Sequence, residues 1–354
     1  MANRFLKLLS ERPFLMADGA TGTNLFGMGL MTGDSPELWN IDHPDRIERL
    51  HQSFVDAGAD LFLTNSFGGT RHRLKLHNGQ DRVHEINKRA AEIARKVADA
   101  AMKAQPGREI VVAGSMGPTG ELFQPMGPLT EQDAIDAFAE QAAALKEGGV
   151  DVLWIETMYS REEVSAAVAG AATTGLPFVT TMSFDTNGKT MMGISPADFV
   201  AFVHTLDPKP VAYGANCGVG ASDLVATIVK LAEAAAPDDI IIAKGNCGIP
   251  YYEEGKIRYN GTPELMADYA RIVRDAGARI VGGCCGTSPG HLHSIRGALD
   301  AHEPGAKPNA AEIIARLGPI SEGAQALLAG TDIAAGAPKR SRRRDRGGAE
   351  ESAF

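Results

Sequence analysis

Short apolar runs recur along the chain with few polar residues inside them. Because they do not alternate between apolar and polar positions, they predict strands that are buried on both faces, as the strands of parallel sheets are. The eight clearest runs lie at 14–17, 60–63, 110–113, 152–155, 178–181, 211–213, 240–243 and 280–281.

Most of these runs are separated by segments with helical periodicity. Segment 44–57 places Ile47, Leu50 and Phe54 on one face, and segment 129–148 is rich in alanine. Segments 263–276 and 289–301 both begin with proline behind a residue that suits an N-cap. Eight strand–helix units over about 300 residues predict an α/β fold, a (β/α)₈ TIM barrel, in preference to a doubly wound sheet. The long segment 18–60 predicts an extended first loop over the barrel mouth.

The C-terminal part differs in composition from the rest. We place the barrel at 1–303 and a C-terminal extension at 304–354. The extension is expected to contain one short helix over 310–317 and then a disordered tail. Six of the eight residues from 339 to 346 are Lys or Arg.

Charge and hydropathy exclude several classes of protein. The 354 residues include 35 Lys and Arg against 44 Asp and Glu, a formal net charge of −9, which argues against nucleic acid as a partner. One alternative of another class remains, in which the Arg-rich tail binds RNA or an acidic partner, although the tail lacks the aromatic residues that stack on bases. No apolar run approaches the roughly 18 residues of a membrane span, and residues 1–10 lack the core of a signal peptide. We therefore expect a cytoplasmic protein without a membrane partner.

Three cysteines form the strongest candidate for chemistry. Four cysteines in so long a chain do not make a disulfide framework. Cys284 and Cys285 stand between glycines after the eighth apolar run, and Cys217 follows the sixth. Because parallel strands of a barrel end at the same face, the three thiols are expected to converge there. Three protein ligands with one open position are typical of a catalytic zinc site, so we predict that these cysteines bind Zn²⁺ at the C-terminal ends of the strands.

Cys247 is a rival ligand. The segment Asn246-Cys247-Gly248 repeats the order of residues around Cys217, at the end of the seventh run. The thiol is either a metal ligand or a small buried group that fills the barrel mouth, and we favour the second interpretation.

Two acidic residues also follow apolar runs. Asp18 and Glu156 could bind an ammonium group, act as acid or base, or cap turns, and a buried Glu156 would need a partner. The glycine-rich turn after Asp18 has neither phosphate-binding pattern, yet its backbone N–H groups could receive a carboxylate. The histidines suggest no chemistry, since His291 and His293 do not share a helix face.

Taken together, these segments resemble the zinc-dependent homocysteine S-methyltransferases from about residue 15 to residue 299. The resemblance implies that Cys217, Cys284 and Cys285 bind zinc and that the open position receives the sulfur of homocysteine. It also implies substrate binding by Asp18, by Gly19 and Thr21 of the following turn, by Glu156, and by Asn216; no catalytic residue beyond the zinc site is expected. The matching segments are 18–23, 64–67, 117–120, 155–157, 216–217 and 282–286.

The methyl donor is a separate question. Members of the family use betaine, S-methylmethionine, or methylcobalamin on another module. The betaine enzymes carry tyrosines where this chain has Gly68 and Thr157. Segments 35–40, 64–68 and 117–122 look more like the homocysteine modules of cobalamin-dependent methionine synthases. We therefore expect methionine formation with methylcobalamin on a separate corrinoid protein. The alternative is a betaine enzyme acting alone, with an aromatic box built from Trp39, Phe67, Tyr159 and Tyr213.

Overall fold

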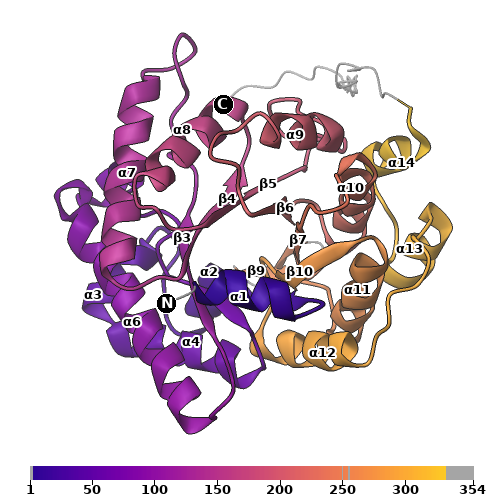
Figure 1. Ribbon diagram of the computed structural model, residues 1–354, viewed down its shortest axis with the longest axis horizontal. Coiled ribbons are helices and arrows are strands. Elements are labelled where there is room, and N and C mark those ends of the chain that lie inside the picture. The colour runs from indigo at the N-terminus through magenta and orange to yellow at the C-terminus, as the bar shows by residue number, and fades with distance from the viewer. Residues whose placement is uncertain (1–2, 249, 254–255, 332–354) are drawn as a thin grey trace, which may run out of the picture.

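The computed structural model describes residues 3–331 except 249 and 254–255, so the predicted disordered tail and its basic segment lie outside the described residues. Eight parallel strands form a nearly closed barrel with helices around it (Figure 1). Neighbouring strands follow the order β1-β10-β7-β6-β5-β4-β3-β2. The strands are β1 (Leu15–Met16), β2 (Leu61–Leu63), β3 (Val111–Met116), β4 (Val152–Met158), β5 (Phe178–Met182), β6 (Ala212–Cys217), β7 (Ile241–Gly245) and β10 (Ala278–Gly283).

All eight strands coincide with the apolar runs of the sequence, which confirms the predicted fold class. The helices between them carry the chain back to the start of the next strand, as parallel pairing requires. They are α4 (Pro44–Asp56), α6 (Val83–Ala104), α7 (Glu131–Glu147), α8 (Arg161–Ala172), α9 (Pro196–Val203), α10 (Ala221–Ala234), α11 (Pro263–Asp275) and α12 (Pro289–Asp300).

The helices predicted from N-caps begin where expected. Thr262 accepts a hydrogen bond from the backbone N–H of Leu265, and Ser288 forms a capping box with His291. Proline occupies the first turn of both helices, where its missing N–H has no intrahelical partner to lose.

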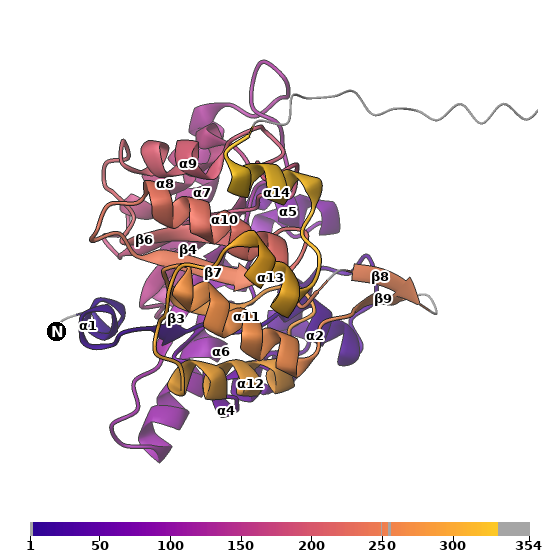
Figure 2. The ribbon, with the colours of Figure 1, turned by 90° about the vertical axis from the view of Figure 1, so that its right-hand side faces the viewer.

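One end of the barrel is closed by α1 (Arg4–Glu11), which lies opposite the hairpin of β8 (Pro250–Glu253) and β9 (Lys256–Tyr259) in Figure 2. Phe5, Leu8 and Leu9 of this helix pack with the apolar side chains inside the barrel, among them Trp154. Since α1 covers the N-terminal ends of the strands, the C-terminal ends remain as the face where a site can form.

The loops at the C-terminal ends contain further short elements. The long first loop predicted over the mouth contains α2 (Thr21–Gly27), η1 (Pro36–Leu38) and α3 (Trp39–Asp42). The second strand is followed by α5 (Arg71–Leu74), η2 (Lys75–His77) and η3 (Gln80–Arg82).

Aspartates join the barrel seam between β1 and β2. The Asp60 N–H donates to the carbonyl of Met16 at 2.8 Å, and the Met16 N–H donates to the Asp60 carboxylate at 2.8 Å. The Asp18 carboxylate accepts the N–H of Leu63, also at 2.8 Å. Side-chain carboxylates therefore supply hydrogen bonds where a regular strand ladder is missing.

Within the part of the chain that the structure describes, two helices follow the barrel. The helix expected over 310–317 is α13 (Ala310–Leu317), and the sequence did not indicate the second, α14 (Glu322–Ala329). Ser321, which caps α14, donates to the buried carboxylate of Asp223 on α10. Among the described residues, no helix combines the length and apolar character that crossing a membrane requires.

Candidate metal centre

The structure brings Cys217, Cys284 and Cys285 together at the ends of β6 and β10. Their sulfur atoms all lie within 4.8 Å of one another. The Sγ atom of Cys217 is 2.8 Å from that of Cys284 and 3.8 Å from that of Cys285. Sulfurs bound tetrahedrally to one zinc at roughly 2.3 Å would lie about 3.8 Å apart, so the three side chains fit such an ion.

Unusual backbone conformations make this convergence possible. Cys217 has a left-handed φ of 58°, which turns its side chain away from the regular alternation of β6. Gly283, just before the cysteine pair, has no room for a Cβ, which would lie 2.3 Å from the side chain of Thr287. Gly286, just after the pair, has a φ of 80°. These residues end the strand and turn the two adjacent thiols toward the same place.

The thiols are in hydrogen-bonding contact within the cluster. Hydrogen bonds from Cys217 and Cys284 lower the pKa of Cys285 to about 3, and the Tyr259 hydroxyl contributes in the same direction. The hydrogen bonds to Cys284 and Cys285 raise the pKa of Cys217. Three sulfurs in mutual contact are a donor set that a soft divalent cation can occupy once their protons leave.

A layer of polar residues lies directly beneath the thiols. Side chains along a strand share a face at every second residue. Thus Ser115, Glu156, Thr181 and Lys244 each follow, by two positions, an apolar residue of the barrel interior. All four are buried, and together with Asp18 and Asn216 they form a polar floor above the apolar core.

Glu156 offers one open carboxylate oxygen in this floor. Its Oε1 atom accepts the Ser115 hydroxyl at 2.6 Å, and its Oε2 atom has no hydrogen-bond partner among the described residues. Burial raises the pKa of Glu156 to about 7, opposed by the charge of Lys244. An acid with one free oxygen beside a thiol cluster can receive an ammonium group.

Asp18, in contrast, is fully engaged with the protein. Its Oδ1 atom accepts Lys244 Nζ at 2.7 Å, and its Oδ2 atom accepts the N–H of Leu63. Burial raises the pKa of Asp18, and the Lys244 ammonium opposes that shift. The geometry therefore gives Asp18 a structural role at the seam, while its predicted contact with substrate stays a prediction.

The turn after Asp18 packs against the cysteine motif. A Cβ on Gly19 would lie 2.6 Å from the carbonyl oxygen of Thr287, which accepts the Ala20 N–H at 3.1 Å. Thr21 begins α2 and is half-buried. This turn consequently fixes the position of the backbone after Cys285.

Asn216 links the floor to the thiols. Its Oδ1 atom accepts the N–H of Thr157 at 3.0 Å and the Thr181 hydroxyl at 2.6 Å. Its Nδ2 atom donates to the Thr157 hydroxyl at 2.7 Å and lies 3.9 Å from Cys284 Sγ. These contacts hold Thr157 at a φ of 63°, a strained value for a β-branched residue, directly after Glu156.

Cys247 lies outside the three-sulfur group. Its buried thiol is 3.3 Å from the Gly261 carbonyl and 3.2 Å from His291 Nε2. Burial raises the pKa of Cys247 to about 11, which keeps the thiol protonated. These contacts agree with the interpretation of Cys247 as a buried structural residue.

Two tyrosines approach the sulfurs. Burial and nearby acidic groups raise the pKa of Tyr159 to about 12, and the three cysteines are among those groups. Tyr259, on β9, is hydrogen-bonded to Cys285. Two other residues considered for an aromatic box point elsewhere: Tyr213 bonds to Asp239, before the start of β7, and Trp39 is buried under Arg46.

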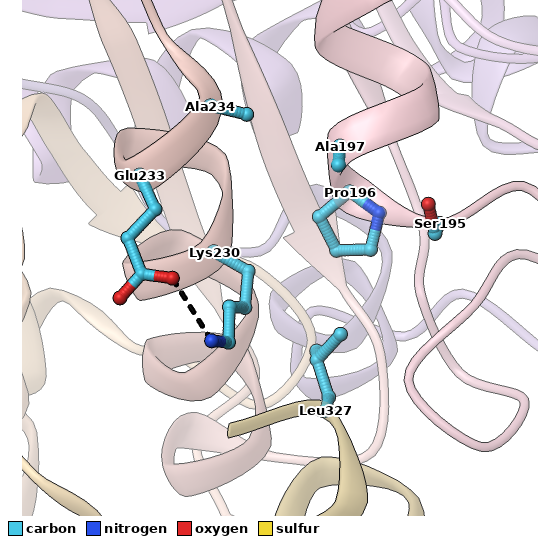
Figure 3. A pocket seen from close by; sticks show the side chains of 7 residues that line it. All are labelled: Ser195, Pro196, Ala197, Lys230, Glu233, Ala234 and Leu327. Carbon is cyan, nitrogen blue, oxygen red and sulfur yellow. Dashed lines mark hydrogen bonds and ion pairs between the residues drawn. The ribbon is translucent and has the colours of Figure 1, made fainter. Parts of the chain in front are cut away.

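Two hollows elsewhere on the described surface contain none of the predicted site residues. One of about 200 Å³ lies between α9, α10 and α14 and includes the ion pair of Lys230 and Glu233, 2.9 Å apart (Figure 3). Another, of about 480 Å³, is lined by charged residues of α6 and by Ile41 and Pro44. Neither hollow gathers the predicted site residues, whereas the polar floor and its thiols do.

Sequence reasoning missed Ser115, Lys244 and Tyr259. A serine in a glycine-rich loop and a lysine at a strand end are common, so residue type alone gives no signal for them. The period of two would have placed Ser115 and Lys244 on the inward face, beside Glu156.

Comparison with known proteins places this site in context. The sequence model of a family described as homocysteine S-methyltransferase matches residues 15–299. The methionine synthase of Mycobacterium tuberculosis is 30% identical over 309 residues, covering 83% of this chain and 25% of that protein. The methionine synthase of Mycobacterium leprae is 29% identical over 316 residues, covering 86% of this chain and 26% of that protein. The chain thus spans about a quarter of the length of these curated relatives.

Solved structures give the same fold. The metallated form of the homocysteine methyltransferase MmuM from Escherichia coli superposes with a TM-score of 0.71 at 23% identity, covering 83% of this chain and 99% of that one. At this identity the likeness shows the barrel and no finer property.

Proposed function

The chain belongs to the homocysteine S-methyltransferase family, and we propose that it methylates homocysteine to methionine at a zinc ion held by Cys217, Cys284 and Cys285. The convergence of three sulfurs within 4.8 Å, above a floor with an open carboxylate, is the observation that supports this proposal most strongly. We place the enzyme in a reducing compartment, the cytoplasm, because all four cysteines are free thiols.

Zinc, when bound, acts as a Lewis acid that keeps a thiol deprotonated at neutral pH. The protein itself orients the substrate. The free oxygen of Glu156 receives the ammonium group of homocysteine. Ser115 holds the Glu156 side chain in place by donating a hydrogen bond to the other carboxylate oxygen of Glu156. Asn216 fixes the backbone next to Glu156 and contacts Cys284, so the ammonium site and the sulfur site are held in register.

The reaction is a transfer of one methyl group. The sulfur of homocysteine forms a bond to the methyl carbon, the bond from that carbon to its donor breaks, and the electron pair stays with the donor. Because only a thiolate is a useful nucleophile here, the residues that hold the sulfur deprotonated also determine the rate.

We further propose methylcobalamin, carried by a separate corrinoid protein, as the donor. The resemblance of segments 35–40, 64–68 and 117–122 to the homocysteine modules of cobalamin-dependent methionine synthases supports this choice. Gly68 and Thr157, at the positions where betaine enzymes carry tyrosines, also support methylcobalamin as the donor. A Cβ on Gly68 would lie 2.9 Å from the buried carboxylate of Glu37, which already accepts the Gly68 N–H, and Thr157 is tied to Asn216.

Betaine remains the second candidate, because Tyr259 is hydrogen-bonded to Cys285 and the cysteines contribute to the raised pKa of Tyr159. Aromatic faces at that place could hold a quaternary ammonium by cation–π attraction. This arrangement adds Tyr259 to the aromatic box considered from the sequence and leaves out Trp39 and Tyr213.

A donor panel tests the proposal. Zinc-loaded protein and homocysteine are incubated with betaine, S-methylmethionine, free methylcobalamin or methylcobalamin on a corrinoid protein, and methionine is measured. We expect methionine from methylcobalamin, most of all on the carrier protein, and little from betaine. The Cys284→Ala variant should be inactive with every donor. Methionine formation from betaine alone, with no response to methylcobalamin, would establish the second candidate instead.

A further inference from the structure

A buried lysine stands at the centre of the polar floor. Lys244 lies on β7, is 3% exposed, and follows Ile242 on the inward face of the barrel. Its Nζ atom is 2.7 Å from Asp18 and 5.8 Å from the ring centroid of Trp154. Burying a charged pair costs more free energy than packing apolar residues of the same volume, so the position calls for a reason beyond stability.

The hydrogen bonds of Lys244 are incomplete. An ammonium group has three N–H donors. Among the described residues, the carboxylate of Asp18 is the one acceptor that Lys244 Nζ reaches. Two donors of a buried cation thus remain for another acceptor, and an anionic acceptor would be the strongest.

The groups around Lys244 keep it charged and indicate where an anionic acceptor would bind. Burial alone would lower the pKa of Lys244, but Asp18, Glu156 and Cys284 together raise it above its usual value. The lysine therefore stays charged, and the charges of both Glu156 and Cys284 act on it. In homocysteine the ammonium and carboxylate groups share one carbon atom, so a site that holds the ammonium at Glu156 has the carboxylate next to it.

We propose that Lys244 is a substrate-binding residue that receives the carboxylate of homocysteine while Glu156 receives its ammonium group. This inference rests on the proposed function. It makes the floor selective, because a thiol that carries both charges of an amino acid meets both partners, whereas an aminothiol without the carboxylate leaves Lys244 with two unused donors. Asp18 then holds the lysine in position and does not itself need to touch the substrate.

Two thiol ligands distinguish a substrate-binding role of Lys244 from a structural one. Homocysteine and 3-aminopropane-1-thiol share the thiol, the chain length and the ammonium group, and only homocysteine has the carboxylate. Their dissociation constants are measured by calorimetry on zinc-loaded protein under anaerobic conditions. For the wild type we expect homocysteine to bind about 10- to 100-fold more tightly than the aminothiol.

Replacing the lysine should remove this preference. In Lys244→Met, homocysteine affinity should fall about 10- to 100-fold, while affinity for 3-aminopropane-1-thiol should change by less than about threefold. Lys230→Met, which removes the α10 lysine labelled in Figure 3, should keep the wild-type ratio.

The unpaired Asp18 carboxylate could unfold the single variant, so a second replacement keeps a donor toward it. Lys244→Gln should lose the preference for homocysteine, and Lys244→Arg, which keeps the positive charge, should retain part of it. An equal effect of the lysine replacement on both thiols would overturn the role of Lys244 and leave the proposed function intact. Wild-type, zinc-loaded protein that failed to bind homocysteine would overturn both.

Discussion

At the scale of single residues, each thiol of the cluster depends on its own local geometry. Cys217 is positioned by its left-handed backbone, and Cys284 by Asn216 at 3.9 Å. Hydrogen bonds from the other two cysteines and from Tyr259 lower the pKa of Cys285. Cys247 lies apart, with Gly261 and His291 as its neighbours.

We predict that the purified protein binds about one zinc per chain and that replacing any one of the three clustered cysteines by alanine removes most of it. Cys247→Ala is the matched control, because it also removes a buried thiol from a strand end. Metal content after gel filtration, measured by atomic emission, checks this. Loss of zinc from Cys247→Ala with retention in Cys217→Ala would show that the ligand set is wrong.

The raised pKa of Glu156, about 7, predicts a pH dependence. Below pH 7 the carboxyl is mostly neutral and holds an ammonium group weakly, so homocysteine affinity should rise between pH 6 and pH 8. In Glu156→Gln this component should disappear, affinity should be lower by about 10- to 100-fold at pH 8, and zinc content should not change. Calorimetric titrations of both proteins across the range provide the test; identical pH profiles would exclude this role for Glu156.

The raised pKa of Glu156 also affects the free energy of unfolding, which should fall with rising pH whereas homocysteine affinity rises. Because the folded protein holds the Glu156 proton up to about pH 7 and the unfolded chain releases it near 4.5, this residue lowers the free energy of unfolding as the pH rises through that interval. Urea unfolding of Glu156→Gln should lack this component, which separates the stability effect from the binding effect.

The sequence identified the site residues whose chemistry is rare and left out those whose chemistry is common. Adjacent cysteines between glycines indicate metal binding, and the structure brings them together with Cys217. The roles of Ser115 and Lys244 follow only from their contacts in the folded barrel, with Glu156 and Asp18 respectively. Single-residue signals of this kind cannot reveal a contact between strands that are distant in the sequence.

At the scale of elements, the strand that carries two of the thiols depends on a close approach at Gly283. A Cβ there would meet both branches of the Thr287 side chain at about 2.3–2.4 Å. That crowding cannot be relieved by one flexible side-chain end, because Thr287 is itself buried and its carbonyl supports the turn after Asp18.

Gly283→Ala should therefore reduce the free energy of unfolding by about 1–3 kcal/mol and weaken zinc retention. Gly297→Ala is the control, for which we expect the free energy of unfolding to rise. Gly297 lies on an exposed face of α12, where an added Cβ would have no atom within 4 Å, so alanine should stabilise the helix by about 0.5–1 kcal/mol. Urea unfolding measures both. A Gly283→Ala protein as stable as the wild type would contradict the described packing.

The sequence predicted the strands of the barrel but missed the β8–β9 hairpin and the α1 helix. The eight strands were found because burial on both faces makes them uninterrupted apolar runs. The β8–β9 hairpin was missed because it projects from the barrel and Tyr251 is exposed, so no apolar pattern marks it. The α1 helix was missed because its eight residues mix Phe5, Leu8 and Leu9 with charged residues.

At the scale of the whole molecule, barrel closure depends on Asp60. Its carboxylate accepts Arg12 at 2.5 Å, the backbone of Met16 at 2.8 Å and Arg296 at 3.0 Å. This one side chain therefore connects the start of the first strand with the last barrel helix, at the seam that the strand ladder leaves open.

Asp60→Asn replaces one accepting oxygen with an amide NH₂ that faces donors. We expect the free energy of unfolding to fall by about 1.5–3 kcal/mol. Asp45→Asn, at an exposed ion pair on α4, should change it by less than about 0.5 kcal/mol. Chemical denaturation followed by circular dichroism compares the two, and equal stabilities would mean that the seam does not need Asp60.

The division into a barrel and a C-terminal extension remains a proposal at this scale. Within the described residues, α14 is tied to the barrel through Ser321 and Asp223, so the part of the extension up to residue 331 packs as an outer layer. The basic segment 339–346 lies outside that part.

The central claim is that three cysteines hold a zinc ion whose open position takes the sulfur of homocysteine. X-ray absorption at the zinc edge, on protein with and without homocysteine, tests it most directly. We predict three sulfur neighbours at about 2.3 Å and one lighter atom before addition, and four sulfur neighbours afterwards. A sulfur count that stays at three when homocysteine is bound would contradict the claim.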